Sequence, residues 1–493
     1  MLFNSLQFLI FFPLVVLAYF LLPHRFRWAF LLVASYYFYM CWKVEYGLLL
    51  LVSTMAGYWG AMRIGTLPKG DTRRKTYLTL SLGANIAILF AFKYFNFFND
   101  SFRALFNHFN IFYGVPAFNV LLPVGISFYT FQTMSYTIDV YRGHQRPETH
   151  LGKFALYVSF FPQLVAGPIE RAARLLPQFS AEHRFDYVRM CSGLRLMLWG
   201  FFKKLVIADR LALFVDAVFD DPSKWEGISF IAAASLFGWQ IYCDFSGYSD
   251  IAVGSARVLG FDLMRNFNRP FISRSITEFW QRWHISLSTW LRDYLYLPLC
   301  GRSTNKRWWV FSIFIVFMIS GLWHGAAWTF IACGALHAAY LIFEYLSFNS
   351  RRKWCERTGL KNHPRIHRSL NISITMFMLF FGWILFRANS IQDAVYVLQH
   401  LTDGLPQWFS DVIHLRQSAL APVVAGNTLW ELLIGIAAII IMETVQMVDD
   451  QLDISQILAR RPVWFRWLIY YCLVMIILVF GRFEVMEFIY FQF

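Results

Sequence analysis

The chain has 493 residues, of which 58% are hydrophobic and 15% are charged, whereas soluble domains average about 45–50% and about 25%. These values exclude an ordinary soluble protein, a disordered chain and a collagen-like chain, and they indicate a membrane protein. The formal charge of +14 does not indicate nucleic-acid binding, because the cations gather in short segments between apolar runs, where the positive-inside rule places them. We therefore expect membrane lipids, and no nucleic acid, as partners.

The apolar runs predict about eleven transmembrane helices. Each helix needs about 20 mainly apolar residues to cross the hydrocarbon core, and several runs are short. The runs cover residues 6–22, 28–42, 47–62, 77–95, 118–137, 193–217, 228–254, 308–322, 326–346, 370–387, 428–447 and 464–480. The first run has no cation before it and no cleavage pattern, so we expect it to be retained with an extracytoplasmic N-terminus. Alternation from this end places the basic segment 63–75 in the cytoplasm. Alternation among the C-terminal runs, taken separately, places the basic segment 351–368 in the cytoplasm and Phe493 outside.

Residues 138–307 do not resolve into spans, because short apolar stretches alternate there with proline and many charges. Irregular backbone at membrane depth is tolerated only where protein buries it or where it lines a wet cavity. One interpretation is therefore a core of re-entrant and interfacial helices around a central tunnel. The alternative is a set of cytoplasmic loops with amphipathic helices lying on the membrane surface.

Two carboxylates, Asp244 and Asp250, end the apolar run that begins at residue 228. Charged groups are costly in lipid, so these two should face a partner or water, and pairing with a nearby arginine is the expected role. The segment is not a Gly-x-Ser-x-Gly elbow, so we nominate no serine nucleophile in it. Residues 265–271, which include Asn266, fit either a phosphate-bearing ligand or a basic cytoplasmic flank.

His284 lies in a tryptophan-rich stretch, residues 278–294. As one helix, this stretch would carry an apolar stripe and a polar stripe. The apolar stripe consists of Trp280, Trp283, Leu287, Leu291 and Tyr294. The polar stripe consists of Gln281, His284, Ser288 and Arg292. A polar stripe on such a helix fits the wall of a polar tunnel, but an interfacial helix with a wet His284 fits the pattern as well.

His324 lies between two apolar runs, in a helix pair predicted over residues 308–346, with Gly321 and Gly325 close by. An imidazole takes and returns a proton near neutral pH, which suits a general base for a hydroxyl or thiol nucleophile. A histidine packed between helices is the competing interpretation. Neither His324 nor His284 stands in a metal-binding spacing, and no Cys-x-x-Cys occurs, so we expect no metal site and interpret the seven cysteines as buried thiols.

Six segments of the sequence resemble one known family. They are residues 122–143, 159–172, 244–254, 266–271, 276–299 and 319–330. The most specific are Arg-Trp-His-Ile-Ser at 282–286 and Trp-His-Gly at 323–325. Together they are similar to the membrane-bound O-acyltransferase (MBOAT) family and, within it, to the bacterial alginate O-acetylation branch. Cys300 stands where this family would have glycine, which puts the local turn in doubt but not the chemistry.

The resemblance implies an all-helical membrane domain over residues 1–493, with His324 as the catalytic histidine and His284 as the second polar residue of the site. Seven further residues are expected at the tunnel or the substrate: Trp323, Trp280, Arg282, Ser288, Arg292, Asn266 and Asp244. No bound cofactor is implied; acetyl-CoA, or another acyl thioester, would be the co-substrate. The acceptor would be an extracytoplasmic hydroxyl on a serine-dependent periplasmic partner or on a polysaccharide. The protein would lie in the bacterial inner membrane.

Three functional hypotheses follow from these features. The first is an O-acetyltransferase that acts in exopolysaccharide or cell-wall O-acetylation. The second is a transporter or channel in which intramembrane His and Asp residues form a proton or solute path. The absence of two related halves in the sequence weakens this second hypothesis. The third is a membrane scaffold that only positions a polymerase or an exporter.

Overall fold

The structure is a computed structural model that describes residues 1–118, 123–165, 167–301, 305–452, 457–458, 460–483 and 488–491. Part of the predicted run 118–137 and the terminal Phe493 lie outside these residues. Across the described residues the secondary structure is helical and contains no β-strand, which confirms the predicted all-helical class. The chain divides into two compact units, residues 1–197 with 249–265 and residues 198–248 with 266–493.

Unit 1 contains the N-terminal helices. They are α1 (Leu6–Leu21), α2 (His24–Met40), α3 (Val44–Thr66), α4 (Arg73–Leu89), η1 (Phe90–Tyr94), α5 (Phe95–His108), α6 (Ile126–Arg142), α7 (Leu151–Ser159), α8 (Phe161–Leu164), α9 (Ala172–Leu175) and η2 (Leu176–Phe179), with most of α10 (Tyr187–Phe201). Small residues let α3 approach its neighbours closely. A Cβ atom on Gly60 would lie 2.6 Å from the Cβ atom of Ser81 on α4, and one on Gly57 would lie 2.2 Å from a methyl group of Thr133 on α6. Without a water-driven hydrophobic effect between helices, such close backbone packing stabilises a membrane bundle.

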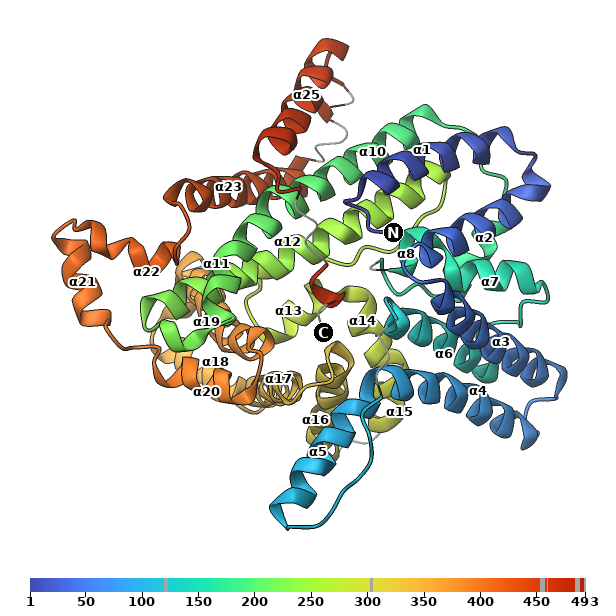
Figure 1. Cartoon of the computed structure of the whole chain (residues 1–493), viewed down its shortest axis with the longest axis horizontal. Coiled ribbons are helices and arrows are strands. Elements are labelled where there is room, and N and C mark those ends of the chain that lie inside the picture. Colours follow the sequence, from blue (N-terminus) through green and yellow to red (C-terminus); the bar gives the residue numbers. More distant parts are fainter. Residues whose placement is uncertain are drawn as a thin grey trace. The chain divides into compact units, whose positions relative to one another are not determined.

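Unit 2 contains the remaining helices. They are η3 (Phe202–Ala208), α11 (Asp209–Phe219), η4 (Pro222–Lys224), α12 (Ile228–Leu259, to residue 248), η5 (Pro270–Ile272), α13 (Ile276–Arg282), α14 (Ile285–Leu291), η6 (Arg292–Tyr296), α15 (Leu297–Cys300), α16 (Lys306–His324), α17 (Trp328–Leu346), α18 (Phe348–Arg357), η7 (Leu360–Asn362), α19 (Pro364–Arg387), α20 (Ile391–Gln399), α21 (Leu405–Ile413), η8 (Gln417–Ala419), α22 (Ala421–Val424), α23 (Leu429–Leu452), α25 (Val463–Phe480) and η9 (Ile489–Phe491). Figure 1 labels most of them.

Eight helical stretches among the described residues are long and apolar enough to cross a membrane. They are Val44–Thr66, Arg73–His108, Ile228–Leu259, Lys306–His324, Trp328–Leu346, Pro364–Arg387, Leu429–Asp449 and Val463–Phe480. A further apolar helix, α1, has only 16 residues, and α2 and α6 have 17 residues each with many polar side chains. Eleven spans therefore stays a prediction. Between α6 and α16 the helices other than α10, α11 and α12 are short, as the mixed pattern of residues 138–307 indicates.

The cysteines differ from their interpretation as buried thiols. Cys243, Cys300 and Cys333 are buried, whereas Cys41 and Cys472 are exposed and the other two are half-buried. The reason is that an apolar run in a membrane protein has a lipid-facing side as well as a core-facing side, and the run alone does not distinguish them.

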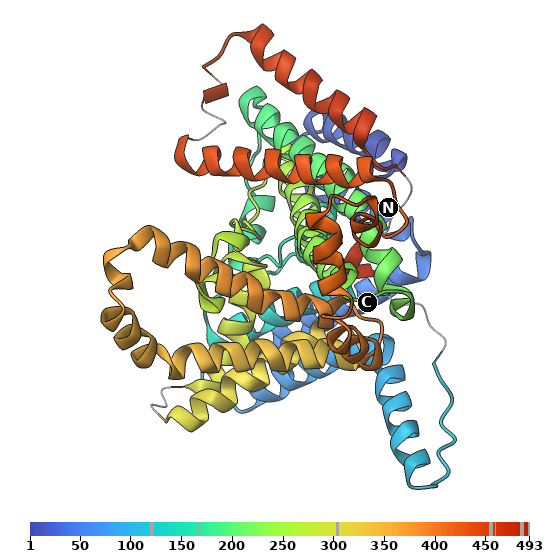
Figure 2. The same ribbon diagram turned by 90° about the vertical axis from the view of Figure 1, so that its left-hand side faces the viewer.

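Helices α16, α17 and α19 lie side by side in unit 2 (Figure 2). The side chain of Asn305 caps α16 by accepting a hydrogen bond from the backbone N–H of Arg307 at 2.9 Å, and Pro364 occupies the first turn of α19, where a missing N–H costs nothing. Glycines bring α16 and α17 into backbone contact. A Cβ atom on Gly321 would lie 2.2 Å from the carbonyl oxygen of Phe330, and one on Gly334 would lie 2.4 Å from that of Phe317.

We expect Gly334→Ala to destabilise unit 2 by about 1–3 kcal/mol, because the added methyl group meets backbone atoms that cannot rotate away. Gly83→Ala on α4 is the matched control, since a Cβ atom there meets nothing within 4 Å and alanine favours the helix. The check is the thermal unfolding midpoint of the purified protein in detergent. Equal midpoints for the two variants would contradict the close α16–α17 contact.

Candidate active site

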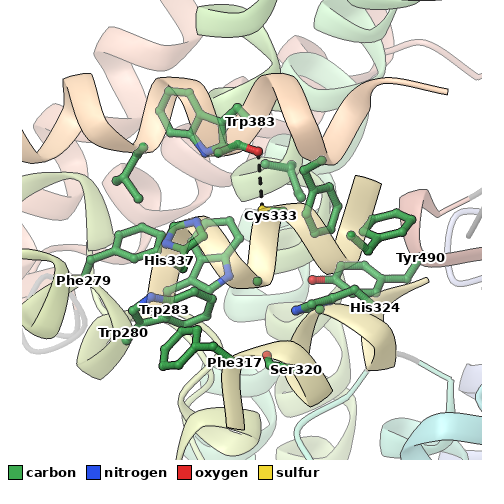
Figure 3. A pocket seen from close by; sticks show the side chains of 17 residues that line it. Phe279, Trp280, Trp283, Phe317, Ser320, His324, Cys333, His337, Trp383 and Tyr490 are labelled. Carbon is green, nitrogen blue, oxygen red and sulfur yellow. Dashed lines mark hydrogen bonds between the residues drawn. The ribbon is translucent and has the colours of Figure 1, made fainter. Parts of the chain in front are cut away.

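Unit 2 encloses a cavity of about 590 Å³, part of it open space, between α13, α16, α17 and α19. Its walls are mainly aromatic and apolar, with a few polar side chains among them. The lining residues are Ile241, Phe279, Trp280, Trp283, Phe317, Ser320, Gly321, His324, Phe330, Cys333, Gly334, His337, Leu379, Gly382, Trp383, Phe386 and Tyr490. Figure 3 shows His324 and Tyr490 toward one end of this cavity and Trp280, Trp283 and His337 toward the other. Small-molecule sites commonly combine such an apolar wall with a few polar groups.

His324 is the last residue of α16. Its side chain lines the cavity, and the residue is 7% exposed. Its ring lies 5.6 Å from that of Tyr490 and 5.4 Å from that of Phe386, measured between centroids. The chain turns directly after it at Gly325, where a Cβ atom would lie 2.1 Å from the ring of Phe330. The glycine thus lets the α16–α17 connection close against Phe330 and leaves His324 facing the cavity.

The single helix predicted through residues 278–294 is interrupted at Trp283 and His284. Ser275 is the N-cap of helix α13, and its hydroxyl accepts from the N–H of Glu278 at 3.0 Å. The helix ends at Arg282, and His284 then adopts a left-handed backbone with φ of 42°. The predicted polar stripe therefore does not form. The cause is a long-range contact that helical periodicity does not reveal. The backbone carbonyl of Asn266 accepts a hydrogen bond from the N–H of Ile285 at 2.8 Å.

Asn266 also orients the His284 ring. The Oδ1 atom of Asn266 accepts the backbone N–H and the hydroxyl of Ser286, at 3.3 and 2.9 Å. The same oxygen lies 3.2 Å from His284 Nδ1. An oxygen in that position accepts, so Nδ1 carries the proton and Nε2 carries the lone pair of the neutral ring. A left-handed non-glycine backbone that its surroundings hold in place is a recurring feature of functional sites.

His284 is fully buried, and the ring of Trp323 connects it to His324 on the cavity wall. The indole of Trp323 lies 5.7 Å from the His284 ring and 5.1 Å from the His324 ring. Burial, with a smaller contribution from charge on His324, lowers the pKa of His284 well below its usual value. His284 is therefore neutral at pH 7.

The other predicted site residues fall into two groups. Trp280 lines the cavity and Trp323 joins the two histidine rings. Three polar side chains instead have local partners: Arg282 pairs with Glu278 at 2.9 Å, the Ser288 hydroxyl donates to the Trp283 carbonyl at 3.2 Å, and Arg292 pairs with Asp293 at 2.8 Å. Asn266 acts through His284, as described above.

Asp244 lies on α12, three residues after the cavity-lining Ile241, in a buried ion network. Its carboxylate is 2.8 Å from Lys204 Nζ, and the same ammonium group is 2.8 Å from Asp209. Its second oxygen accepts the backbone N–H of Ile489 at 2.9 Å. This last bond holds the C-terminal segment against α12 and so places Tyr490 beside His324.

Sequence reasoning missed Tyr490, His337 and Lys204. Tyr490 is separated by more than 160 residues from His324, so no local spacing connects the two. Its ring also packs 4.6 Å from that of Phe245, and its hydroxyl is buried with no hydrogen-bond partner among the described side chains and backbone. An ionisable group inside an apolar run was an available signal for His337.

Comparison with known proteins places this arrangement in a family. The family model "MBOAT, membrane-bound O-acyltransferase family" matches residues 142–391, which carry His284, His324, His337 and most of the cavity wall. The chain belongs to the MBOAT family. The predicted resemblance is thus confirmed, and with it a multi-pass membrane protein of the acyltransferase class.

Relatives of this MBOAT chain are named for acyl transfer to alginate, peptidoglycan or teichoic acid. A probable alginate O-acetylase, AlgI, of Pseudomonas aeruginosa is 41% identical over 80% of this chain and 73% of the relative. A peptidoglycan O-acetyltransferase of Helicobacter pylori is 35% identical over 81% and 79%. A teichoic acid D-alanyltransferase of Bacillus subtilis is 29% identical over 55% and 70%. The names of these relatives share acyl transfer and differ in the polymer.

Proposed function

We propose that this MBOAT protein transfers an acetyl group from cytoplasmic acetyl-CoA to a hydroxyl group on the extracytoplasmic side of the bacterial inner membrane. The acceptor hydroxyl belongs to a polysaccharide or to a serine-dependent periplasmic partner. The observation that carries the proposal is His324, an imidazole that lines a cavity between apolar helices in a chain similar to two named O-acetyltransferases.

In the proposed step, His324 takes the proton from the acceptor hydroxyl as its oxygen attacks the thioester carbonyl. The C–O bond forms, the tetrahedral intermediate collapses, and the C–S bond breaks. The proton then passes from His324 to the departing thiolate, which leaves as CoA thiol. The neutral His284 can accept a hydrogen bond at Nε2, the nitrogen that carries its lone pair, and so orient the acceptor hydroxyl.

The distribution of charge supports entry of the donor from the basic side. Helix α18 and the segment after it carry a dense group of exposed cations: Arg351, Arg352, Lys353, Arg357, Lys361, Arg365 and Arg368. In the proposed topology this segment faces the cytoplasm, with both chain termini extracytoplasmic. Its positive potential would raise the local concentration of the phosphate-bearing donor.

The test is acetyl transfer by the full chain in sealed membrane vesicles. Acetyl-CoA with a ¹⁴C acetyl group is supplied on the cytoplasmic side, with de-O-acetylated alginate or peptidoglycan glycan strands inside the vesicle. We expect CoA release and labelled glycan that mild base treatment frees of its label, as an ester requires. Turnover with neither acceptor, alongside proton-coupled uptake of a solute, would contradict the proposal in favour of transport.

A further inference from the structure

The cavity has a second polar end that the transfer step leaves without a role. It is formed by His337 on α17 and Trp280 on α13, whose rings meet edge to face at 5.2 Å. His337 is 93% buried, with a 7% exposed fraction. Helix α19 makes room for its ring, because a Cβ atom on Gly382 would lie 2.8 Å from His337 Nε2.

The polar atoms at this end lack protein partners. Among the residues that the structure describes, neither His337 Nδ1 nor Trp280 Nε1 has a hydrogen-bond partner. A buried polar group without a partner destabilises a protein, and an ionisable residue within an apolar span is costly as well. Two such groups at one end of one cavity therefore indicate a ligand that completes their hydrogen bonds.

The chemistry of the two side chains defines that ligand. An indole N–H only donates, so the ligand must offer an acceptor to Trp280. A neutral imidazole donates from one nitrogen and accepts at the other. A secondary amide supplies both functions, a carbonyl oxygen and an N–H, and a sugar hydroxyl does too.

The walls favour an amide over a sugar. Around these two groups the lining is mainly Phe279, Trp283, Phe317, Leu379 and Trp383. The other polar groups are the hydroxyl of Ser320, next to Phe317 in Figure 3, and the thiol of Cys333, which is used in a 3.5 Å contact with the Gly382 carbonyl. A sugar would bury several hydroxyl groups against these rings without partners, which is unfavourable. A thin aliphatic arm with isolated amide groups matches the lining.

The order of features along α17 agrees with such an arm. The helix begins at Trp328, four residues after His324, and His337 lies nine residues further, about 14 Å along the axis. The helix then leads into the exposed cations of α18. His337 is thus between the proposed reacting centre and the proposed phosphate-attracting segment.

We infer that His337 and Trp280 bind an amide group of the pantetheine arm of the acyl-CoA donor, an inference that rests on the proposed function. This contact fixes how far the thioester reaches toward His324. Trp280 donates to the amide carbonyl, and His337 accepts from the amide N–H or donates to the same carbonyl. His337 is on this account a donor-binding residue that takes no proton in the reaction.

The test is binding of S-acetonyl-CoA, a thioether analogue that cannot transfer its acyl group, to the full chain in nanodiscs by calorimetry. We expect His337→Leu to weaken this binding by about tenfold or more, and His337→Gln, which can both donate and accept, to stay within about threefold of wild type. Binding of 3′,5′-ADP, which lacks the arm, should be the same in all three proteins. His414→Leu, at an exposed position on no cavity wall, is the matched control.

Two further measurements make the result specific. The first uses an analogue of S-acetonyl-CoA in which methylene groups replace the amide nearer the sulfur. The wild type should bind this analogue more weakly than it binds S-acetonyl-CoA. His337→Leu should bind the two compounds with the same affinity. Trp280→Phe, which removes the N–H but keeps an aromatic ring, should weaken S-acetonyl-CoA about tenfold even if His337→Leu fails to fold.

The outcomes separate this inference from the proposed function. Wild-type binding of S-acetonyl-CoA that neither His337→Leu nor Trp280→Phe changes would overturn this inference and leave the proposed function standing. No binding of S-acetonyl-CoA by the wild type would overturn the proposed function and this inference with it.

Discussion

His324→Ala is expected to lower acetyl transfer by about 10²–10⁴-fold, the usual contribution of a positioned general base. The loss should appear in kcat, because the hydroxyl proton must leave as the carbonyl is attacked and no other described side chain on the His324 side of the cavity is an imidazole. The measurement is CoA release together with labelled acetyl ester on the glycan in membrane vesicles.

The control for this variant is His414→Ala, because His414 is exposed and its Nδ1 contacts only a local carbonyl, that of Ser410 at 2.7 Å. Both variants should reach the membrane in wild-type amount, since alanine at position 324 removes a ring beside an existing cavity. Normal acetylation by His324→Ala at normal expression would remove His324 from the mechanism. Loss of protein in place of loss of turnover would assign it a packing role.

The sequence was sufficient to predict the parts of the fold that depend on local pattern. The apolar runs at 308–322, 326–346 and 370–387 lie in α16, α17 and α19, because a chain segment in the hydrocarbon core must satisfy its backbone hydrogen bonds internally, as a helix does. In the structure, Gly325 stands at the turn after His324, and Gly321 allows close packing of α16 against α17. Recognition of the family rested on the same local segments.

Long-range contacts account for what the sequence did not predict. The pattern of residues 278–294 fits one helix, but the hydrogen bonds of Asn266, 18 residues before His284, break it. Polar residues placed on the expected tunnel wall, such as Arg282 and Arg292, formed ion pairs with neighbours in the chain. Tyr490 reached the site through a bond between residues 245 positions apart, which no periodicity encodes.

Lys204→Met is expected to cost about 3–5 kcal/mol of stability, the usual effect of removing one partner from a buried ion network. Lys204 is 1% exposed, and its ammonium group bridges two carboxylates, those of Asp209 and Asp244, at 2.8 Å each. Without it, two acidic groups would remain buried in an apolar bundle. The measurement is the thermal unfolding midpoint in detergent, and Lys224→Met, which removes an exposed ion pair with Asp221, should leave the midpoint unchanged.

A triple variant separates charge from packing. Adding Asp209→Asn and Asp244→Asn to Lys204→Met removes all three charges and should recover much of the lost stability, because neutral side chains carry a far smaller desolvation cost than unpaired carboxylates. A triple variant as unstable as the single one would show that Lys204 acts through packing of its aliphatic chain. The asparagine at 244 keeps an oxygen that can accept the N–H of Ile489, so the recovered protein should also keep Tyr490 beside His324 and retain more transfer activity than Lys204→Met. The ion network would then stabilise unit 2 and, through one backbone hydrogen bond, determine the shape of the cavity in which the reaction is proposed to occur.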